Sequence, residues 1–202
     1  MKIQRPTRRN DTTRTTNSTI NKWVLDLGCG RNKVTGALGL DRFPIEGVDV
    51  VHDLEQFPYP FETNRFDEIY ARHVIEHVES VGRFLDELYR IAKPGGRLYI
   101  NTPHYSYSNS WRDPTHRWHF SAYSFEYFEV GHPADYYAST AKFRIVSVRI
   151  TMLNLWRLVG MEWLINAVNH HPRWRFFRKF WEEYLSFIFR AREIQAILEV
   201  VK

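Results

Sequence analysis

The stretch "WVLDLGCGRNKVTGALGLD", Trp23 to Asp41, decides the fold that we expect. Residues 23–27 are almost all apolar and predict a short buried strand. This strand stops at Gly28 and Gly30, where a missing side chain lets the backbone turn tightly beside a ligand. A second apolar run, 37–40, follows after a connection shorter than the usual helical crossover. We therefore expect the first helix of this connection to be reduced to a turn.

The rest of the chain alternates short apolar runs with helical or loop segments. Apolar residues at helical spacing predict an amphipathic helix over 80–93. Apolar or alternating patterns predict further strands over 48–51, 66–70, 97–101, 143–151 and 193–201. Several of these strands are nearly all apolar and are separated by helices or loops. That order is typical of an α/β layer with a largely parallel sheet.

The composition excludes several classes of protein. No run approaches the about 20 apolar residues of a transmembrane helix, and the N-terminus has no apolar core typical of a secretory signal. A single cysteine rules out an internal disulfide. We expect a cytoplasmic protein with a disordered basic tail over 1–20 and one domain over 21–202. The net charge of +5 is concentrated before residue 23, so it does not indicate a nucleic-acid partner.

Acidic side chains stand at the ends of three predicted strands. Asp26 lies near the end of the first strand, Asp41 ends the second, and Asp53 follows the third. Open α/β sheets bind ligands at this edge, and a carboxylate after the second strand suits a ribose diol. The three acids predict a nucleoside site. Lys33 stands where the dinucleotide fingerprint needs its third glycine, which disfavours NAD.

Five motifs in this order carry a family resemblance: "VLDLGCG", "LGLD", "VVHDLEQFPYPF", "FDEIYARHVIEHV" and "FLDELYRIAKPGGRLYINTP". Over about residues 22–130 the chain resembles the class I S-adenosylmethionine-dependent methyltransferases. The resemblance implies S-adenosylmethionine as cofactor. It also implies a Rossmann-like, seven-stranded, mostly parallel sheet with helices on both faces. The strands over 143–151 and 193–201 would form an antiparallel pair at one edge.

The same resemblance assigns residues to parts of the cofactor. The glycine turn with Asp26 would lie under the methionine part, Asp41 would bind the ribose hydroxyls, and Asp53 would accept from the adenine amino group. The full set that it places at the cofactor is Asp26, Gly28, Cys29, Gly30, Asp41, Asp53, Leu54, Arg72 and His73. Lys33 either pairs with the cofactor carboxylate or is an exposed loop lysine.

Polar residues after the fourth and fifth predicted strands are candidates for the acceptor side. Methyl transfer needs the acceptor atom in line with the methyl group, and a base where the acceptor must lose a proton. Histidine is well suited to exchange that proton near neutral pH. The predicted catalytic residues are His77, Asp113 and His116. The alternatives are that His77 only lines a helix and that Asp113 belongs to a plain turn.

A metal ion is a further possibility at the same loop. His116 and His119 are three residues apart and could ligate an ion together with Asp113. Because no second compact pair of ligands is visible in the sequence, we expect that no metal is required.

The segment 153–191 is expected to form a helical insertion between the last two strands. Its aromatic residues recur at helical spacing in Trp174, Phe177, Trp181, Tyr184 and Ile188, opposite Arg175, Arg178, Lys179, Glu182 and Ser186. The expected structure is an amphipathic helix whose aromatic face packs on the core or on a second subunit in a homodimer. The alternative is a peripheral membrane contact through 174–189.

The predicted function is methyl transfer from S-adenosylmethionine to an oxygen of a small polar or saccharide acceptor. The segment "DPTHRWHF", 113–120, supports this prediction because it resembles a segment of glycan-tailoring methyltransferases. One alternative is a quinone-like or lipid-linked acceptor. Another is a catalytically silent subunit that binds the cofactor and supports a partner.

Overall fold

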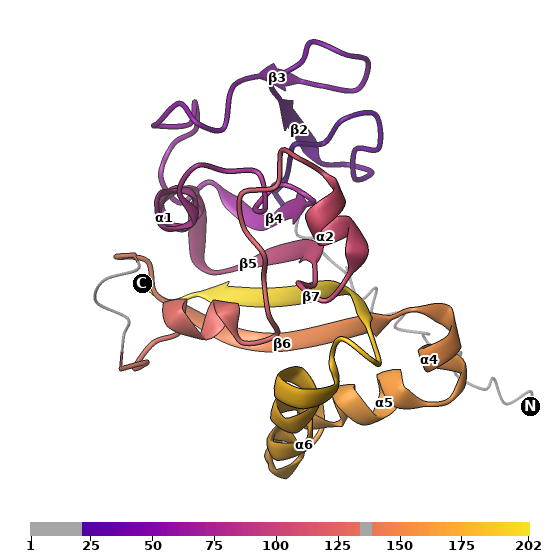
Figure 1. The fold of residues 1–202 in the computed structure, drawn as a ribbon. Coiled ribbons are helices and arrows are strands. Elements are labelled where there is room, and N and C mark those ends of the chain that lie inside the picture. The colour runs from indigo at the N-terminus through magenta and orange to yellow at the C-terminus, as the bar shows by residue number, and fades with distance from the viewer. Residues whose placement is uncertain (1–21, 134–138) are drawn as a thin grey trace, which may run out of the picture.

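The computed structural model describes residues 22–133 and 139–202 (Figure 1). The predicted basic tail therefore lies outside the described residues. Within these ranges seven strands form one sheet. They are β1 (Val24–Leu27), β2 (Leu38–Asp41), β3 (Val50–Val51), β4 (Phe66–Arg72), β5 (Ala92–Pro103), β6 (Phe143–Met152) and β7 (Ala191–Val200).

The strand order confirms the predicted Rossmann-like sheet. The order is β3-β2-β1-β4-β5-β7-β6. Strands β1 to β5 are parallel, whereas β7 runs antiparallel to both β5 and β6. The β6–β7 pair is the antiparallel pair that was expected at one edge. All five parallel strands therefore present their carboxyl ends at the same edge of the sheet, which is where such sheets bind ligands.

The connection from β1 to β2 contains no helix, as expected from its length. Residues 28–37 form turns, and Cys29 N donates to Leu40 O at 3.2 Å. The close approach depends on Gly39, because a Cβ there would lie 2.5 Å from Lys33 Cδ and 2.8 Å from Cys29 Sγ. The glycine turn is thereby packed directly against β2.

Helix α1 (Val81–Ile91) matches the predicted amphipathic helix. Ser80 caps its N-terminus by accepting from Arg83 N at 3.3 Å. Its apolar face buries Phe84, Leu85, Leu88 and Ile91 in the main hydrophobic core. The loop from β4 to α1 is thus fixed at both ends, by a strand before it and by a capped helix after it.

Short helices follow β5 and fill the segment between β6 and β7. Helix α2 (Ser108–Arg112) and a 3₁₀ turn over 124–128 lie after β5. The segment between β6 and β7 contains α4 (Asn154–Leu158), α5 (Met161–Asn166) and α6 (Arg175–Phe180), which a π-helical turn over 181–185 extends. The described ranges contain no helix long and apolar enough to cross a membrane.

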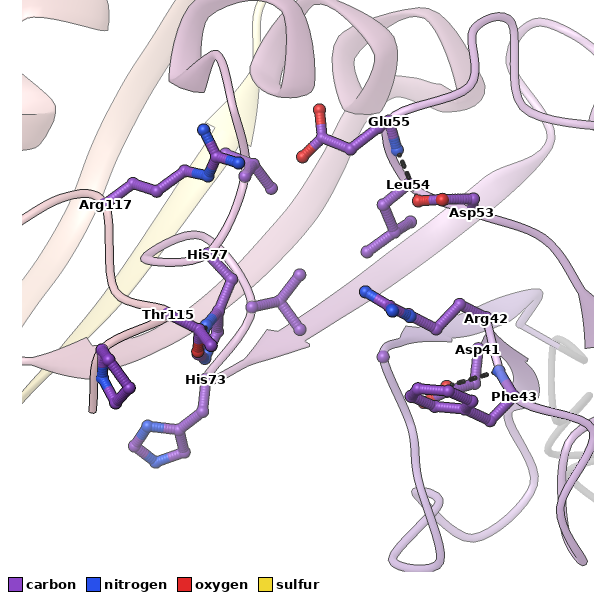
Figure 2. A pocket seen from close by; sticks show the side chains of 14 residues that line it. Asp41, Arg42, Phe43, Asp53, Leu54, Glu55, His73, His77, Thr115 and Arg117 are labelled. Carbon is purple, nitrogen blue, oxygen red and sulfur yellow. Dashed lines mark hydrogen bonds between the residues drawn. The ribbon is translucent and has the colours of Figure 1, made fainter.

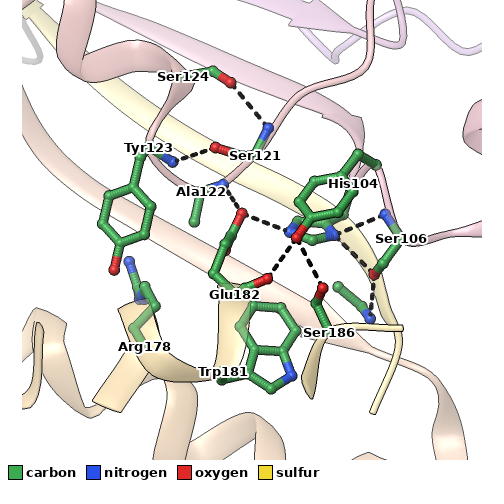
Figure 3. Close-up of polar contacts among 12 residues, drawn as sticks. His104, Ser106, Ser121, Ala122, Tyr123, Ser124, Arg178, Trp181, Glu182 and Ser186 are labelled. Carbon is green, nitrogen blue, oxygen red and sulfur yellow. Dashed lines mark hydrogen bonds and ion pairs between the residues drawn. The ribbon is translucent and has the colours of Figure 1, made fainter. Parts of the chain in front are cut away.

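The packing expected for the end of this segment is observed only in part. Trp181 from the aromatic face is fully buried in the core, whereas Tyr184 and Ile188 from the same face are exposed. Arg178, Glu182 and Ser186 from the polar face are buried as well. The reason is a buried polar network (Figure 3). The Glu182 carboxylate accepts from Ala122 N at 3.0 Å and from His104 Nε2 at 3.2 Å. Both bonds go to Oε1 and pair buried N–H groups inside the protein, whereas Glu182 Oε2 has no hydrogen-bond partner among the described residues.

Candidate active site

A cavity of about 720 Å³ lies beyond the ends of β1, β2 and β3 (Figure 2). Figure 2 shows Asp41, Arg42 and Phe43 on one side and His77, Thr115 and Arg117 on the other. The lining residues are Gly28, Asp41, Arg42, Phe43, Asp53, Leu54, Glu55, His73, Val74, His77, Val78, Pro114, Thr115 and Arg117. The first cavity therefore collects residues from four strand ends and from the loop after α2.

Two strand-end acids offer carboxylate oxygens at the first cavity. Asp41 accepts from Gly30 N through Oδ2 and from Phe43 N through Oδ1, each at 3.0 Å. Asp53 accepts from Glu55 N at 3.1 Å. A carboxylate oxygen can accept more than one hydrogen bond, so both acids keep capacity for a ligand. The backbone bonds fix the orientation of each carboxylate toward the cavity.

Other predicted cofactor residues lie behind the glycine turn and do not line the first cavity. Asp26 is fully buried, and its Oδ2 lies 2.7 Å from Arg72 Nη2 and accepts from Val34 N at 2.8 Å. Arg72 also donates to Asn32 O at 2.5 Å. Burial raises the pKa of the Cys29 thiol, and the nearby acids Asp26 and Asp41 raise it further. The bonds of Asp26 and Arg72 hold the turn in place.

A second cavity of about 690 Å³ adjoins the first. The two cavities share His73, His77 and Pro114 as common wall. The second cavity is lined by His73, Glu76, His77, Pro103, Tyr107, Asn109, Arg112, Asp113, Pro114, His116, Arg192 and Glu193. All three predicted catalytic residues lie there, and the shared wall puts His77 between the two spaces.

The predicted catalytic residues His77 and Asp113 are connected through a hydroxyl that the sequence did not single out. Thr115 donates to Asp113 Oδ1 at 2.6 Å, and its oxygen lies 3.0 Å from His77 Nδ1. Because Thr115 has a single hydroxyl proton, its oxygen must accept from His77 Nδ1–H. In a neutral imidazole the other nitrogen then carries the lone pair. The hydrogen bonds therefore leave His77 Nε2 free to accept a proton.

His116 is oriented in the same manner. Its Nδ1 lies 3.0 Å from Ser110 O, and a carbonyl oxygen only accepts, so Nδ1 carries the proton. Its Nε2 lies 3.8 Å from Asp113 Oδ2, and its ring meets that of His77 edge-on with 4.7 Å between centroids. His119, the third residue of the metal set considered from the sequence, lines neither cavity. It stacks on Trp111 with 3.6 Å between ring centroids.

His73 stands at the junction of the two cavities. Its φ of +56° lies in the left-handed region that residues other than glycine rarely adopt. The ring Nδ1 lies 3.3 Å from Glu76 Oε1, and this hydrogen bond is the main cause that raises the pKa of His73. A strained backbone beside a cavity is a frequent feature of functional sites. His73 thus contributes to the walls of both cavities.

The family model of the methyltransferase domain matches residues 9–140, more than half of the chain. The chain belongs to the methyltransferase domain family. Curated relatives include the mitochondrial ubiquinone biosynthesis O-methyltransferase of Rattus norvegicus, with 28% identity over 39% of this chain and 30% of the relative. The ubiquinone biosynthesis O-methyltransferase of Pseudomonas putida strain GB-1 is 28% identical over 42% of this chain and 46% of the relative. The chain thus spans less than half the length of these relatives.

A solved structure shares the fold of this methyltransferase. The S-adenosylmethionine-dependent methyltransferase of Archaeoglobus fulgidus superposes with a TM-score of 0.57 at 19% sequence identity. The match covers 88% of this chain and 86% of that chain. At this identity the similarity establishes the fold, and the family model establishes the class of enzyme. The methyltransferase uses S-adenosylmethionine as its cofactor.

The residues of the first cavity fit that cofactor. Asp41 and Asp53 supply acceptors for the donors of a nucleoside, and Leu54 adds an apolar side chain to the lining. Gly28 adopts a φ of +58°, and a Cβ there would lie 2.6 Å from Val74 Cγ2. The tight turn that keeps the backbone close to the ligand is therefore available only to glycine at this position.

Several residues of the site were not predicted from the sequence. Arg42 and Phe43 directly follow the acid at the end of β2, and the strand-end reasoning that selected Asp41 would have reached them. Glu76 stood between His73 and His77 but was not in the predicted catalytic set. It is buried, and its Oε2 accepts from Thr102 Oγ1 at 3.0 Å. No sequence signal joins Glu76 to a threonine in β5.

Proposed function

We propose that this methyltransferase methylates a hydroxyl oxygen of a small polar or saccharide acceptor bound in the second cavity. The observation that carries the proposal is the common wall of His73, His77 and Pro114 between the two cavities. When bound, S-adenosylmethionine supplies a methyl group on a positively charged sulfur. A shared wall allows the chain to hold an acceptor next to that group.

The first cavity is proposed to hold the cofactor. Asp41 would accept from the ribose hydroxyls and Asp53 from the adenine amino group, with Leu54 against the base. His73 would border the methionine end. The buried pair of Asp26 with Arg72, together with Cys29 and Gly30, would act indirectly by holding the turn that includes Gly28.

The polar lining of the second cavity supports a polar acceptor. Tyr107, Asn109, Arg112 and Glu193 offer hydrogen-bond donors and acceptors to the same space. An apolar ring would leave these groups without partners, at a cost of about 1–3 kcal/mol for each group that becomes buried. Hydroxyls of a sugar or another small polar molecule can pair with them. This lining favours the polar acceptor over a quinone-like ring.

His77 is proposed to act as the base. Its Nε2 carries the free lone pair, and its Nδ1–H is bonded to Thr115, which donates to the Asp113 carboxylate. A positive charge that forms on His77 would be stabilised by Asp113 through this chain of hydrogen bonds. His116 and Asp113 would orient the acceptor hydroxyl. A base within reach of the acceptor proton typically contributes about 10²–10⁴-fold in rate.

The test uses the purified chain alone. Calorimetry with S-adenosylmethionine and NAD measures cofactor choice, and a panel of sugars and small polyols is screened by release of S-adenosylhomocysteine. We expect binding of S-adenosylmethionine only and turnover with at least one polyol. Equal binding of NAD would contradict the cofactor assignment. Cofactor binding without turnover on any acceptor would favour the silent-subunit alternative.

A second candidate, a lipid-linked acceptor, is favoured by the exposed apolar side chains of the helical segment. We call this set the apolar patch; its members are Leu155, Leu158, Val159, Trp163, Phe176, Phe180, Tyr184, Phe187 and Ile188. Leu158 is 82% and Phe176 78% exposed. Exposed Arg157, Arg173, Lys179 and Arg190 lie in the same segment. Aromatic and aliphatic side chains next to cationic ones suit an anionic membrane interface.

The proposed membrane contact is tested by sedimentation with phosphatidylglycerol vesicles, with phosphatidylcholine vesicles for comparison. We expect the chain to sediment with the anionic vesicles and Phe176→Ser to weaken that binding. Val130→Ser, which removes an exposed apolar side chain outside the patch, serves as control. Equal binding by both variants and the wild type would contradict a role of the patch. Self-association that Phe176→Ser abolishes, without vesicle binding, would favour the homodimer.

A further inference from the structure

We propose that Glu76, His77 and His116 form a binding site for one divalent metal ion of the zinc class at the second cavity. The proposal rests on the proposed function, because the ion would act on the acceptor hydroxyl. It departs from the expectation, drawn from the sequence, that no metal is required. That expectation considered Asp113, His116 and His119, whereas the structure brings together a different set.

The three side chains offer one carboxylate oxygen and two ring nitrogens. One ligand atom of each residue lies within 4.8 Å of the others. Zinc bonds of about 2.0–2.1 Å in a tetrahedral arrangement place ligand atoms roughly 3.3 Å apart. The set would close around an ion if these separations shortened by up to about 1.5 Å. Two histidines and one carboxylate are also a frequent protein ligand set for zinc.

The hydrogen bonds of both histidines leave the ligand nitrogen free. Nδ1 of His77 donates to Thr115, and Nδ1 of His116 donates to Ser110 O at 3.0 Å. In protein metal sites the ligating histidine almost always donates its other ring N–H to such an acceptor, which fixes the ring and its tautomer. Both Nε2 atoms are thus prepared for an ion. Thr115 is itself held by Asp113, which would make Asp113 an outer carboxylate of the site.

Glu76 supplies an independent observation. Its side chain is 1% exposed, and its partners are the neutral hydroxyl of Thr102 and the ring of His73, which compensates the charge only when it is protonated. Across residues 22–133 and 139–202, no lysine or arginine forms an ion pair with its carboxylate. Burying a carboxylate is costly unless a cation compensates its charge. A bound divalent ion would provide that compensation.

The ion would change how the acceptor loses its proton. Three protein ligands leave a coordination position open toward the second cavity, and an acceptor hydroxyl that binds there becomes more acidic. The O–H bond breaks, the proton passes to water at the open side of the cavity, and the electron pair stays on the oxygen bound to the ion. With an ion bound, His77 and His116 are ligands, and the ion takes over from His77 the task of promoting loss of the acceptor proton. Without an ion, His77 Nε2 is the base proposed above.

The experiment measures metal binding directly. The full chain is stripped with a chelator, dialysed and titrated with CoCl₂, whose visible absorption reports nitrogen and oxygen coordination, and then with ZnCl₂ in competition. We expect one Co²⁺ per chain, displaced by Zn²⁺. His116→Ala and Glu76→Gln should bind at least about 10-fold more weakly. Thr115→Val should lose about 10–100-fold, the usual effect of removing an outer-shell partner.

His119→Ala is the matched control, since it removes a nearby histidine that lies outside the set, and its Co²⁺ affinity should equal that of the wild type. No Co²⁺ spectrum with the wild type, or His116→Ala binding as tightly as the wild type, would overturn the proposal. If circular dichroism shows that Glu76→Gln does not fold, the Co²⁺ affinities of His116→Ala and Thr115→Val test the proposal instead.

A separate measurement, calorimetry of S-adenosylmethionine with the metal-free chain, distinguishes failure of the metal site from failure of the proposed function. Cofactor binding there supports the proposed function even if no metal binds, and full turnover without metal would refute the role of the ion.

Discussion

Polar side chains at the two cavities keep free hydrogen-bond acceptors, whereas polar side chains buried in the helical segment between β6 and β7 bond to the protein. At the cavities, Asp41 and His77 are held by hydrogen bonds on one side and keep a free acceptor on the other. In the helical segment, Glu182 and Ser186 are buried, and their bonds go to the protein itself. The helical segment instead exposes aromatic side chains. Figure 1 shows it beyond β6 and β7, at the end of the sheet opposite β2 and β3.

This difference separates polar groups that shape the fold from polar groups that can meet a ligand. His104 shows the first kind, since its Nε2–H donates to Glu182 and its Nδ1 accepts from Ser106 N at 3.1 Å (Figure 3). Both ring nitrogens are used, and no lone pair remains. His77 shows the second kind, with one nitrogen anchored and the other free. A histidine is a candidate for chemistry when its partners leave a lone pair at a cavity.

The largest expected effect is that of His77→Ala. Loss of a side chain that acts on the acceptor proton should lower the rate by about 10²–10⁴-fold. Cofactor affinity should barely change, because Asp41, Asp53 and the glycine turn are intact. Single-turnover release of S-adenosylhomocysteine and calorimetry measure the two quantities. A loss of cofactor binding that equals the loss of rate would move His77 into the cofactor site.

Glu182→Ala tests whether the buried network contributes to stability and not to cofactor binding. It removes the acceptor of Ala122 N–H and of His104 Nε2–H, and each buried donor left unpaired costs about 1–3 kcal/mol. We expect a lower free energy of unfolding in urea and an unchanged affinity for S-adenosylmethionine. Glu183→Ala, at the exposed neighbouring position, should stay within about 0.5 kcal/mol of the wild type. Equal stability of both variants would show that the network does not hold the segment.

Asp41→Ala should weaken cofactor binding by about 1–3 kcal/mol, because the donors that meet this carboxylate lose their acceptor. Asp67→Ala is the control. Asp67 lies at the start of β4, pairs with Lys93 of β5, and does not line either cavity. Calorimetry compares the two variants with the wild type. Identical affinities for Asp41→Ala and Asp67→Ala would argue against the ribose assignment.

The smallest effect is expected for Phe176→Ser in dilute buffer. The side chain is 78% exposed, so its removal should change the free energy of unfolding by no more than about 0.5 kcal/mol. Of the properties measured here, Phe176→Ser should weaken only the binding of the chain to anionic vesicles. A marked loss of stability in urea would show that the apolar patch packs against the protein, and the contrast between the two regions would then disappear.

The sequence was sufficient for the sheet and for the strand-end acids. Short apolar runs and helical spacing are local signals, and they located α1 and every strand of the described chain to within a few residues, except that β5 begins five residues before the predicted start. Gly28, Asp41 and Asp53 follow from the same signals, since parallel strands must present their carboxyl ends at one edge. The length of the 28–36 connection alone also indicated that β1 and β2 are joined without a helix.

Contacts between distant segments could be read only from the tertiary structure. The helical spacing of aromatic and polar residues over 174–188 defines two faces of a helix but does not indicate which face is buried. The hydrogen-bond partners of Glu182 come from the distant residues 104 and 122. Likewise, His77 and His116 meet because the loop after α2 folds back over the end of β4. Local periodicity reflects the preferences of one segment, whereas burial and ligand sets depend on which segments the folded chain brings together.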